Sequence, residues 1–360
     1  MINEITIKNF KSIKDAAIHL NSLNIFTGLN GVGKSSFIQP LLLLMQSNNL
    51  EKGIIDLNGR LTNTGKGRDV LYQFSQEEII SIIIKIDSEQ FSWECKYQKE
   101  KEVLTTNNNI LITKIQNLEK YFYYINCIRL GPLDIYPTSS EVSENKHIGV
   151  MGEYAPYFID LFGNDYIVSE TLRHPEATSE TLLSQINAWM KEISPGVSLT
   201  TETIPSINVT TLHYQFDYGN NKTNKYLPKN VGSGISYVVP VVLLLLTANE
   251  GKTIVIENPE SHIHPRGQAE IGKLIALAAQ SGAQLFVETH SDHILNGIRV
   301  AIKEKLIDNN KVNIIFFDKE TTETEQFTKI TPIIVDKNGT LSDYPDNFMD
   351  EWSNQLSKLI

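Results

Sequence analysis

The sequence contains few cysteines, no long apolar run and no excess of positive charge. Its two cysteines, Cys95 and Cys127, are too few for a disulfide framework or a four-thiolate zinc site, and they fit a reducing setting. The longest apolar run, Val238–Leu246, is interrupted at Pro240 and is far shorter than the ~20 residues that cross a bilayer. The N-terminal segment alternates apolar and charged side chains, unlike a secretory signal. We therefore expect a soluble, cytoplasmic protein without a membrane partner.

Acidic residues outnumber basic ones. The chain has 32 Lys and Arg against 42 Asp and Glu, a formal net charge of −10. This balance argues against a general nucleic-acid coat protein, although a local basic groove remains compatible with it. With 41% hydrophobic residues in a chain of 360, a large core can be buried. Disordered and fibrous classes are thereby excluded, and one large or two smaller domains are expected.

The N-terminal segment predicts strands followed by a loop and a helix. Apolar residues recur over residues 2–7, and after a turn at Asn9–Lys14 a second extended segment covers Ala16–Leu20. A short apolar run, Leu23–Thr27, then enters a glycine-rich turn, and a helix is expected over Ser35–Gln46. This order is strand, loop, helix.

The middle of the chain, about residues 50–226, is polar and rich in Asn, Thr and Ser. Alternating segments at Glu78–Ile86 and Gln90–Gln98 predict β-hairpins, the run Asn107–Asn109 predicts a loop tip, and a helix is expected near Thr181–Glu192. Two interpretations stay open for this region: a structural insertion or a partner-binding surface.

The last third alternates strands and helices, which predicts a parallel sheet flanked by helices. The tail, Thr328–Ile360, is expected to add one strand and an acidic, aromatic end at Tyr344–Trp352. The expected helices are Gly234–Ala248, Arg266–Gln280 and Asp292–Glu304, and the expected strands are Thr253–Glu257, Gln284–Glu288 and Val312–Phe317.

The strongest motif is GLNGVGKS at Gly28–Ser35, which matches G-x-x-x-x-G-K-[ST] at every fixed position. Glycines let successive backbone N–H groups face one anion, and the N-terminus of the next helix adds partial positive charge. Lys34 is expected to reach the β- and γ-phosphates of ATP, and the Ser35 hydroxyl is a hard ligand for Mg²⁺. The expected nucleotide-binding residues here are Asn30, Gly31, Gly33, Lys34, Ser35 and Ser36.

Three further residues are candidates for catalysis. Glu257 ends an apolar strand, where a carboxylate faces the ligand crevice of a parallel sheet, and it is the expected Mg²⁺-side acid. Glu260 follows three residues later and can act as general base on water, or it is a loop or helix-start carboxylate. His290 leaves the next strand and can contact the γ-phosphate, or it belongs to a helix cap formed by Ser291 and Asp292.

These residues resemble the ABC-type ATPase branch that contains RecF, SMC proteins and the OLD nucleases. The resemblance lies in the opening strands, in LNIFTGLNGVGKSS at Leu23–Ser36, in ENPESHIHPRGQ at Glu257–Gln268 and in ETHSDHILNGIR at Glu288–Arg299. It narrows to prokaryotic standalone AAA family ATPases with a C-terminal domain of unknown function, which GTLSDYPDNFMDEW at Gly339–Trp352 resembles.

The resemblance implies an α/β fold: a P-loop NTPase of ABC-ATPase type, with a mixed sheet flanked by helices and an inserted lobe of sheet and helix. We expect residues 1–74 to form the N-terminal part of the ATPase domain and residues 75–226 the inserted lobe. Residues 227–320 would carry the signature, Walker B and histidine loop, and residues 321–360 a tail subdomain.

The resemblance also implies a signature loop at Gly232, Ser233 and Gly234, which caps the γ-phosphate held by a second subunit. A second anion-receptive helix start in the chain favours a homodimer on ATP binding, with higher oligomers left open. The loop can instead be a plain helix start. Ser261–His264 would be the D-loop at the dimer seam, and metal binding by His262 and His264 is the less favoured alternative.

Two departures from the family pattern affect the predicted chemistry. Asn258 stands where most ABC-type ATPases place the glutamate that acts on water, and an amide cannot take a proton. Either Glu260 takes the role or hydrolysis is slow. The glutamine of the Q-loop has no firm place, with Gln73 as the candidate.

We expect an ATPase that uses ATP and Mg²⁺ as a dimerisation switch in prokaryotic defence against phage or plasmids. About 70 residues follow His290, too few for a usual nuclease domain, so a nuclease or toxin effector would be a separate protein. The alternatives are a RecF-like DNA-maintenance ATPase, which needs a basic groove, and a regulatory protein that scarcely hydrolyses ATP. The candidate basic clusters are Lys8, Lys11 and Lys14, and Arg60, Lys66 and Arg68; each can equally be a solvated face.

Overall fold

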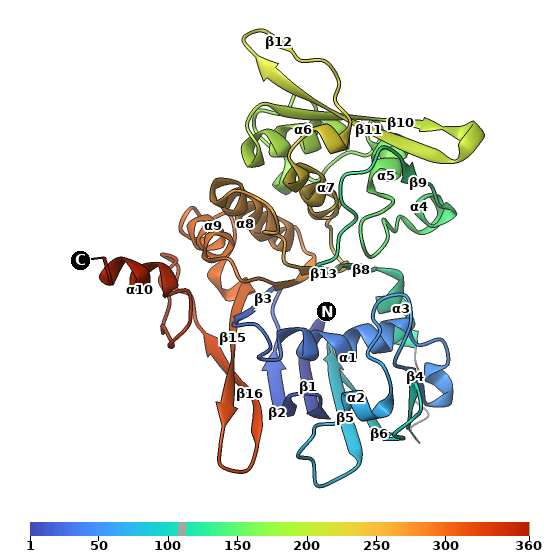
Figure 1. Cartoon of the computed structure of the whole chain (residues 1–360), viewed down its shortest axis with the longest axis vertical. Coiled ribbons are helices and arrows are strands. Elements are labelled where there is room, and N and C mark those ends of the chain that lie inside the picture. The colour runs from blue at the N-terminus through green and yellow to red at the C-terminus, as the bar shows by residue number, and fades with distance from the viewer. Residues whose placement is uncertain (107–112, 360) are drawn as a thin grey trace. The chain divides into compact units, whose positions relative to one another are not determined.

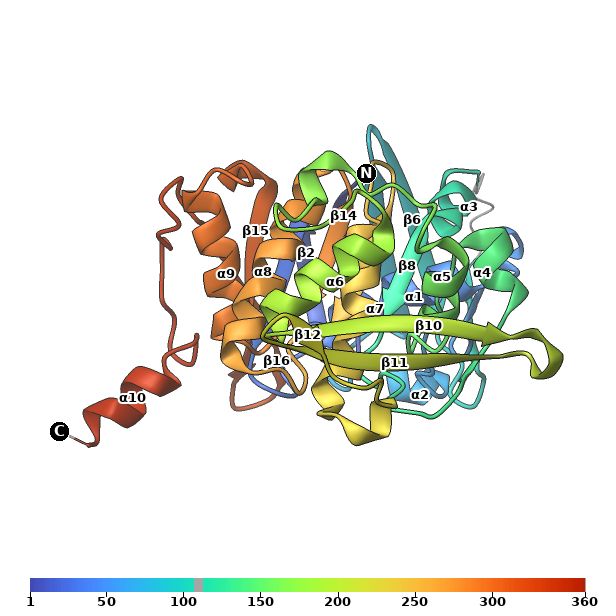
Figure 2. The ribbon, with the colours of Figure 1, turned by 90° about the horizontal axis from the view of Figure 1, so that it is seen from above.

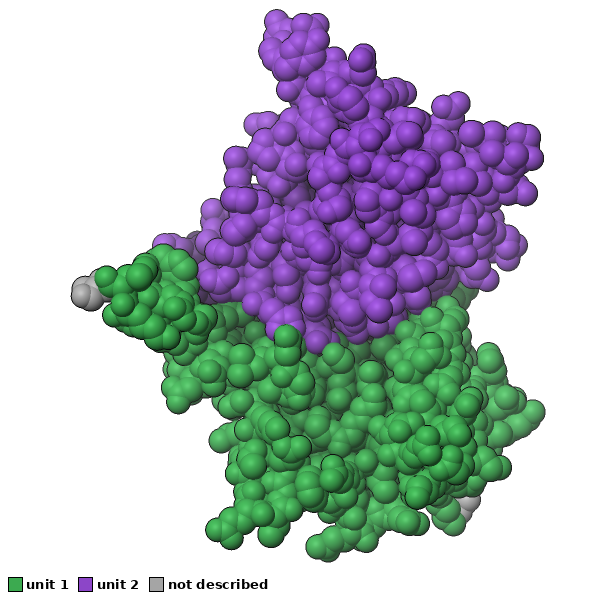
Figure 3. All heavy atoms as spheres, in the orientation of Figure 1, with its two compact units in different colours: residues 1–122, 312–335, 341–360 green, residues 123–311, 336–340 purple. Residues whose placement is uncertain are grey.

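The computed structural model describes residues 1–106 and 113–359, and these residues form two compact units (Figure 3). Unit 1 comprises Met1–Phe122, Val312–Val335 and Leu341–Ile360; unit 2 comprises Tyr123–Lys311 and Asp336–Thr340. The predicted loop tip Asn107–Asn109 lies outside the described residues. The four-segment division made from the sequence stays a prediction.

A six-stranded sheet in unit 1 has the order β2-β1-β5-β6-β7-β4. Its described pairs are antiparallel, and they confirm the hairpin expected over residues 78–98, because Ile82 pairs with Trp93. Alternate side chains such as Ile80, Ile84 and Trp93 are fully buried, which explains why the pattern reads as a one-sided sheet. The strands are β1 (Ile2–Phe10), β2 (Ile13–His19), β4 (Ile54–Asp56), β5 (Ile79–Ile86), β6 (Glu89–Lys96) and β7 (Val103–Thr106).

A second group of strands in unit 1 leads into the glycine-rich loop. Strand β3 (Leu23–Gly28) pairs in parallel with β15 (Val312–Thr321), which pairs antiparallel with β16 (Gln326–Ile333) (Figure 1). Helix α1 (Lys34–Gln46) follows the loop and packs Phe37 against Phe26 and Phe317. Strand β15 is longer than the predicted Val312–Phe317, because its pairing with β16 continues where the apolar run ends.

Unit 2 contains the predicted parallel strands β13 (Thr253–Glu257) and β14 (Gln284–Glu288), with β8 (Phe122–Ile125) beyond β13. Three helices come close to their predicted bounds: α7 (Ser233–Leu246), α8 (Pro265–Gln280) and α9 (Asp292–Lys303). Strands β10 (Val197–Ile204) and β11 (Val209–Tyr218) form a long antiparallel ribbon (Figure 2). The α/β prediction, with a mixed sheet flanked by helices, is confirmed.

The remaining elements are short or peripheral. The helix predicted near Thr181–Glu192 is present as α6 (Leu182–Ile193). Among the residues that the structure describes, no helix is long and apolar enough to cross a membrane. The other elements are α2 (Gly67–Val70), α3 (Thr113–Lys120), β9 (Tyr136–Pro137), α4 (Ser140–Asn145), α5 (Ala155–Phe162), β12 (Asn221–Lys222) and α10 (Glu351–Ser357).

Helices α8 and α9 approach each other through two glycines. A Cβ atom on Gly272 would lie 2.3 Å from the carbonyl oxygen of Ile294, and one on Gly297 would lie 2.1 Å from that of Ala269. Both contacts are with backbone, which cannot move aside cheaply, so this packing requires glycine on each helix.

We expect Gly297→Ala to lower the free energy of unfolding by about 2 kcal/mol, because overpacking outweighs the better helix propensity of alanine. Denaturant unfolding of the full chain measures this change. Val300→Ala on the exposed side of α9 serves as the control and should change stability by less than about 0.5 kcal/mol. Equal stabilities of the Gly297 variant and the wild type would contradict the close packing.

Candidate functional site

The glycine-rich loop of unit 1 adopts a backbone that side chains would obstruct. Gly28, Gly31 and Gly33 have φ angles of 138°, 76° and 107°. A Cβ on Gly28 would meet the Phe317 carbonyl oxygen at 2.1 Å, and one on Gly33 would meet Thr328 Oγ1 at 2.2 Å. Glycine is therefore required at two positions by space as well as by conformation.

Lys34 lies at the start of α1 and is 4% exposed. Its ammonium donates hydrogen bonds to the carbonyl oxygens of Gly28 (2.9 Å) and Leu29 (2.7 Å). The charge is thus held against the loop that is expected to curl around phosphate. Asn30 and Gly31 are exposed and Ser35 and Ser36 are half-buried, so the predicted phosphate-binding residues lie together in one loop and helix start.

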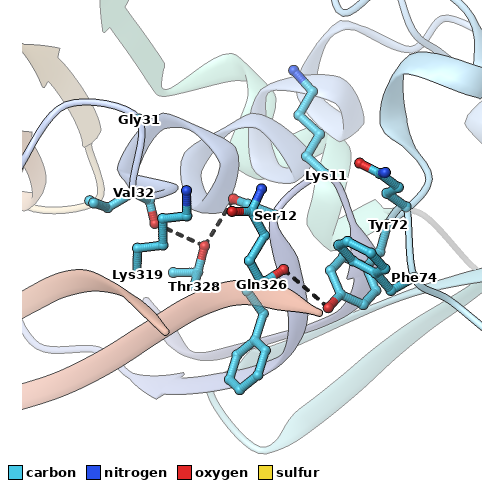
Figure 4. Close-up of a pocket in the computed structure, with 11 residues that line it drawn as sticks. Lys11, Ser12, Gly31, Val32, Tyr72, Phe74, Lys319, Gln326 and Thr328 are labelled. Carbon is cyan, nitrogen blue, oxygen red and sulfur yellow. Dashed lines mark hydrogen bonds between the residues drawn. The ribbon is translucent and has the colours of Figure 1, made fainter. Parts of the chain in front are cut away.

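A pocket of about 210 Å³ adjoins this loop at Gly31 and Val32 (Figure 4). It combines cationic, amide and aromatic side chains, and burial lowers the pKa of Lys11 on one wall. Its lining includes Gln73, the residue proposed from the sequence as the glutamine of the Q-loop. The other lining residues are Ser12, Tyr72, Phe74, Lys319, Gln326, Phe327 and Thr328.

Hydrogen bonds tie the pocket walls together. Thr328 Oγ1 lies 2.8 Å from the Val32 carbonyl oxygen and 2.9 Å from Ser12 Oγ (Figure 4). The Tyr72 hydroxyl donates toward Glu325 Oε2 at 3.1 Å, and Glu325 also pairs with Lys14. Burial, and then the Glu325 carboxylate, raise the pKa of Tyr72 to about 12, so the phenol stays a donor at neutral pH.

Glu257 stands at the end of β13 in unit 2, as predicted, and both carboxylate oxygens accept a hydrogen bond. Tyr124 Oη donates to Oε1 at 2.8 Å, and the Cys127 backbone N–H donates to Oε2 at 3.1 Å. Arg129 donates to the main-chain oxygens of Glu257 (2.8 Å) and Asn258 (2.5 Å). Sequence reasoning missed Tyr124 and Arg129, because they lie in a region interpreted as an insertion and match no motif.

Glu260 contacts the segment that carries His290. Its carboxylate accepts from Thr289 Oγ1 and from the His290 backbone N–H, both at 2.8 Å. The alternative proposed for this segment is also present, since Ser291 Oγ caps α9 by accepting from the N–H groups of His293 and Ile294. The structure therefore brings Glu260 and His290 together, with the His290 side chain exposed.

The start of α7 presents two exposed residues, Gly232 and Ser233, followed by the buried Gly234. A Cβ on Gly234 would lie 2.1 Å from the His262 carbonyl oxygen, so packing explains this glycine. A Cβ on Gly232 would meet no described atom within 4 Å, so the packing around position 232 does not require glycine there.

The two candidate metal histidines have structural partners. His262 stacks on Tyr237 at 4.6 Å between ring centroids, and His264 Nδ1 accepts from the Arg266 N–H at the start of α8. Over residues 1–106 and 113–359, no three His, Cys, Asp or Glu side chains are grouped in a way that could hold a metal.

Most of the candidate basic residues are paired with carboxylates. Lys8 pairs with Asp15 and Lys14 with Glu325 in the first cluster. In the second, Arg60 pairs with Glu119, and Lys66 and Arg68 both pair with Glu100. These ion pairs reduce the positive potential that binding to DNA phosphates needs.

The α/β fold and the glycine-rich loop between a strand and a helix define a P-loop ATPase domain. Residues 23–296 match the family described as "AAA domain, putative AbiEii toxin, Type IV TA system". The chain belongs to this AAA domain family. Residues 307–359 match a second family, described as a protein of unknown function (DUF3696), which confirms the resemblance of the C-terminal segment.

Two solved structures share the fold at low sequence identity. One is an SmcHead bound to the C-winged helix domain of ScpA: TM-score 0.55, 13% identity, covering 92% of this chain and 98% of that one. The other is an Smc head domain with an extended coiled coil, bound to the C-terminal domain of ScpA, from Pyrococcus furiosus: TM-score 0.55, 11% identity, covering 99% of each chain. No curated protein matches the sequence.

We expect Thr328→Val to lower the free energy of unfolding by about 1–2 kcal/mol, because the Val32 carbonyl and the Ser12 hydroxyl lose their buried partner. Thr328 is 5% exposed, so water does not replace it readily. Chemical denaturation measures the loss, and Thr331→Val in the same strand is the control. A Thr328 variant as stable as that control would show that the loop does not depend on this contact.

Proposed function

We propose that this protein binds ATP on the loop Gly28–Ser35, hydrolyses it slowly and uses it to bring two copies of the chain together. The observation that carries the proposal is the loop itself: three glycines at positive φ, a buried Lys34 held against loop carbonyls, and a helix that begins at once. This arrangement favours a triphosphate, because backbone N–H groups and an ammonium address the same anion.

The pocket beside Gly31 supplies a place for the nucleoside. Tyr72, Phe74 and Phe327 offer aromatic surface, and Gln73 and Gln326 offer donors and acceptors for a base. Its position against the loop supports a ligand that extends from the phosphates.

Mg²⁺ fits the oxygen donors that the chain provides. Ser35 offers a hydroxyl, and the two oxygens of the Glu257 carboxylate offer several lone pairs, of which hydrogen bonds from Tyr124 and Cys127 use only part. Bound Mg²⁺ would neutralise phosphate charge. We assign Ser35 and Glu257 to the ion, and not His262 and His264, which have structural partners.

Hydrolysis would depend on Glu260 and His290. Asn258 cannot take a proton, so Glu260 is the acid that can act on water, and its backbone contact holds the His290 segment. Because both oxygens of Glu260 already accept hydrogen bonds, we expect turnover to be low.

Gly232 and Ser233 supply the second half of a composite site. They are exposed at the N-terminus of a 14-residue helix, where an anion from another copy would meet partial positive charge. A homodimer with two such sites follows. A defence role with a separate effector is supported by the family description, which names a toxin system. The ion-paired basic clusters give no support to the RecF-like alternative.

We expect the mass of the wild-type chain, measured by light scattering, to double on addition of ATP and Mg²⁺. Lys34→Ala should weaken ATP binding by about 100-fold or more, because a charge-assisted contact to phosphate is lost, and should stay at the unliganded mass. Gly232→Asp should still bind ATP and fold, since its Cβ position is open, but should not double because its carboxylate repels phosphate. A wild-type mass that ATP does not change would refute nucleotide-driven dimerisation.

We expect Glu260→Gln to lower kcat by about 100-fold or more, because the amide cannot take the proton, with ATP affinity nearly unchanged. Steady-state phosphate release and equilibrium binding of ATP measure the two effects. Thr289→Val, which removes one hydrogen bond to the same carboxylate, is the matched variant and should reduce kcat by less than about 10-fold. If Glu260→Gln retains wild-type turnover, Glu260 is not the base.

A further inference from the structure

The end of β8 and the residues that follow it contact both the main chain and the side chain of Glu257 at the end of β13. Arg129, which is 4% exposed, donates from Nη1 to the Glu257 carbonyl oxygen and from Nη2 to that of Asn258. Tyr124 and the Cys127 N–H take one oxygen each of the Glu257 carboxylate. Four donors from six consecutive residues thus fix the position and the direction of one acid.

The shape of arginine suits the backbone at this point. Asn258 has a φ of 45°, in the left-handed region, and the carbonyl oxygens of Glu257 and Asn258 both lie within reach of one guanidinium. The planar fork of arginine holds two acceptors in a fixed relation, whereas a lysine ammonium is a single flexible point donor. The Arg129 fork therefore stabilises a turn that an unaided chain adopts reluctantly.

Tyr124 donates to Glu257 from a buried position. Its hydroxyl lies 2.8 Å from Oε1 of the Glu257 carboxylate, and the residue is 8% exposed, so water does not readily compete for this contact. This contact fixes the rotation of the carboxylate.

Stability alone does not explain a buried cation at this position. Arg129 is 4% exposed, and the described hydrogen bonds of its guanidinium go to main-chain carbonyl oxygens. None of the ion pairs within the described residues includes Arg129. Burying such a charge costs more than burying an apolar side chain of similar size. We therefore relate the buried Arg129 to the position of Glu257 and Glu260 rather than to stability alone.

We infer that Arg129 and Tyr124 are positioning residues of the hydrolytic site: they fix the turn that joins Glu257 to Glu260 and the direction of the Glu257 carboxylate. The inference rests on the proposed ATP hydrolysis. Neither residue is needed to bind ATP, because Lys34 and its loop hold the phosphates in that proposal. Loss of either should therefore lower kcat and leave affinity intact.

The experiment compares Arg129→Lys and Tyr124→Phe with the wild-type full chain. Arg173→Lys is the matched control, since Arg173 also donates to a carbonyl oxygen, that of Val168, and pairs with Glu180. Three quantities are measured: kcat and KM for ATP, the Kd of a fluorescent ATP analogue, and hydrogen exchange at the Ser261 and Ile263 amides. These amides donate to Asn258 and Glu260 within the turn.

For Arg129→Lys we expect kcat to fall by about 30- to 100-fold, with KM and Kd within about 3-fold of wild type, because a displaced catalytic group costs rate rather than affinity. Exchange at Ser261 and Ile263 should become faster. Tyr124→Phe should lower kcat by about 10-fold without changing Kd. Arg173→Lys should match the wild type in all three.

Wild-type kcat and wild-type exchange in Arg129→Lys would overturn the inference, as would a rise in Kd equal to the loss of kcat/KM. If Arg129→Lys fails to fold, Tyr124→Phe decides: unchanged kcat overturns the inference. If the wild type binds ATP without turnover, the proposed hydrolysis fails, and hydrogen exchange alone tests the role of Arg129. Faster exchange at Ser261 and Ile263 in Arg129→Lys then supports the inference that Arg129 fixes the turn between Glu257 and Glu260, and unchanged exchange refutes it.

Discussion

The close approach of two strands to the glycine-rich loop is the contact on which unit 1 depends. The Phe317 carbonyl occupies the space beside Gly28, and the Thr328 hydroxyl occupies the space beside Gly33. Both neighbours come from the C-terminal part of the chain, nearly 300 residues away from the loop in sequence. Glycine there serves conformation and packing at once, so the hairpin of β15 and β16 sets the shape of the loop from outside it.

Much of the α/β fold follows from local patterns. Strands β13 and β14 have their predicted bounds because buried parallel strands are short apolar runs that end in an acid. The long helices came within two residues of their predicted starts, since each has a clear apolar periodicity and a Pro, Gly or Ser at its beginning. The pairing of β1 with β5 was not predicted, because a contact between strands more than 70 residues apart leaves no local signal.

The candidate site was predictable only where a motif marks it. The phosphate loop and Glu257 stand out by spacing, whereas Tyr124 and Arg129 lie about 130 residues before the acid that they contact. Asn258 was interpreted only as a missing base. Its φ of 45° adds a conformational reason, because a short amide tolerates the left-handed region better than a glutamate does. The choice of asparagine at position 258 is therefore explained by backbone geometry as well as by its effect on proton transfer.

The contact between Gly234 and His262 has a mechanical consequence. The first turn of α7 and the loop after β13 touch with no room for one added carbon atom, and the Tyr237 and His262 rings stack beside that contact. Two segments packed this closely cannot move toward each other, because protein interiors resist compression. A small displacement of the exposed residues Gly232 and Ser233 would therefore also displace the loop after β13, which carries Glu260.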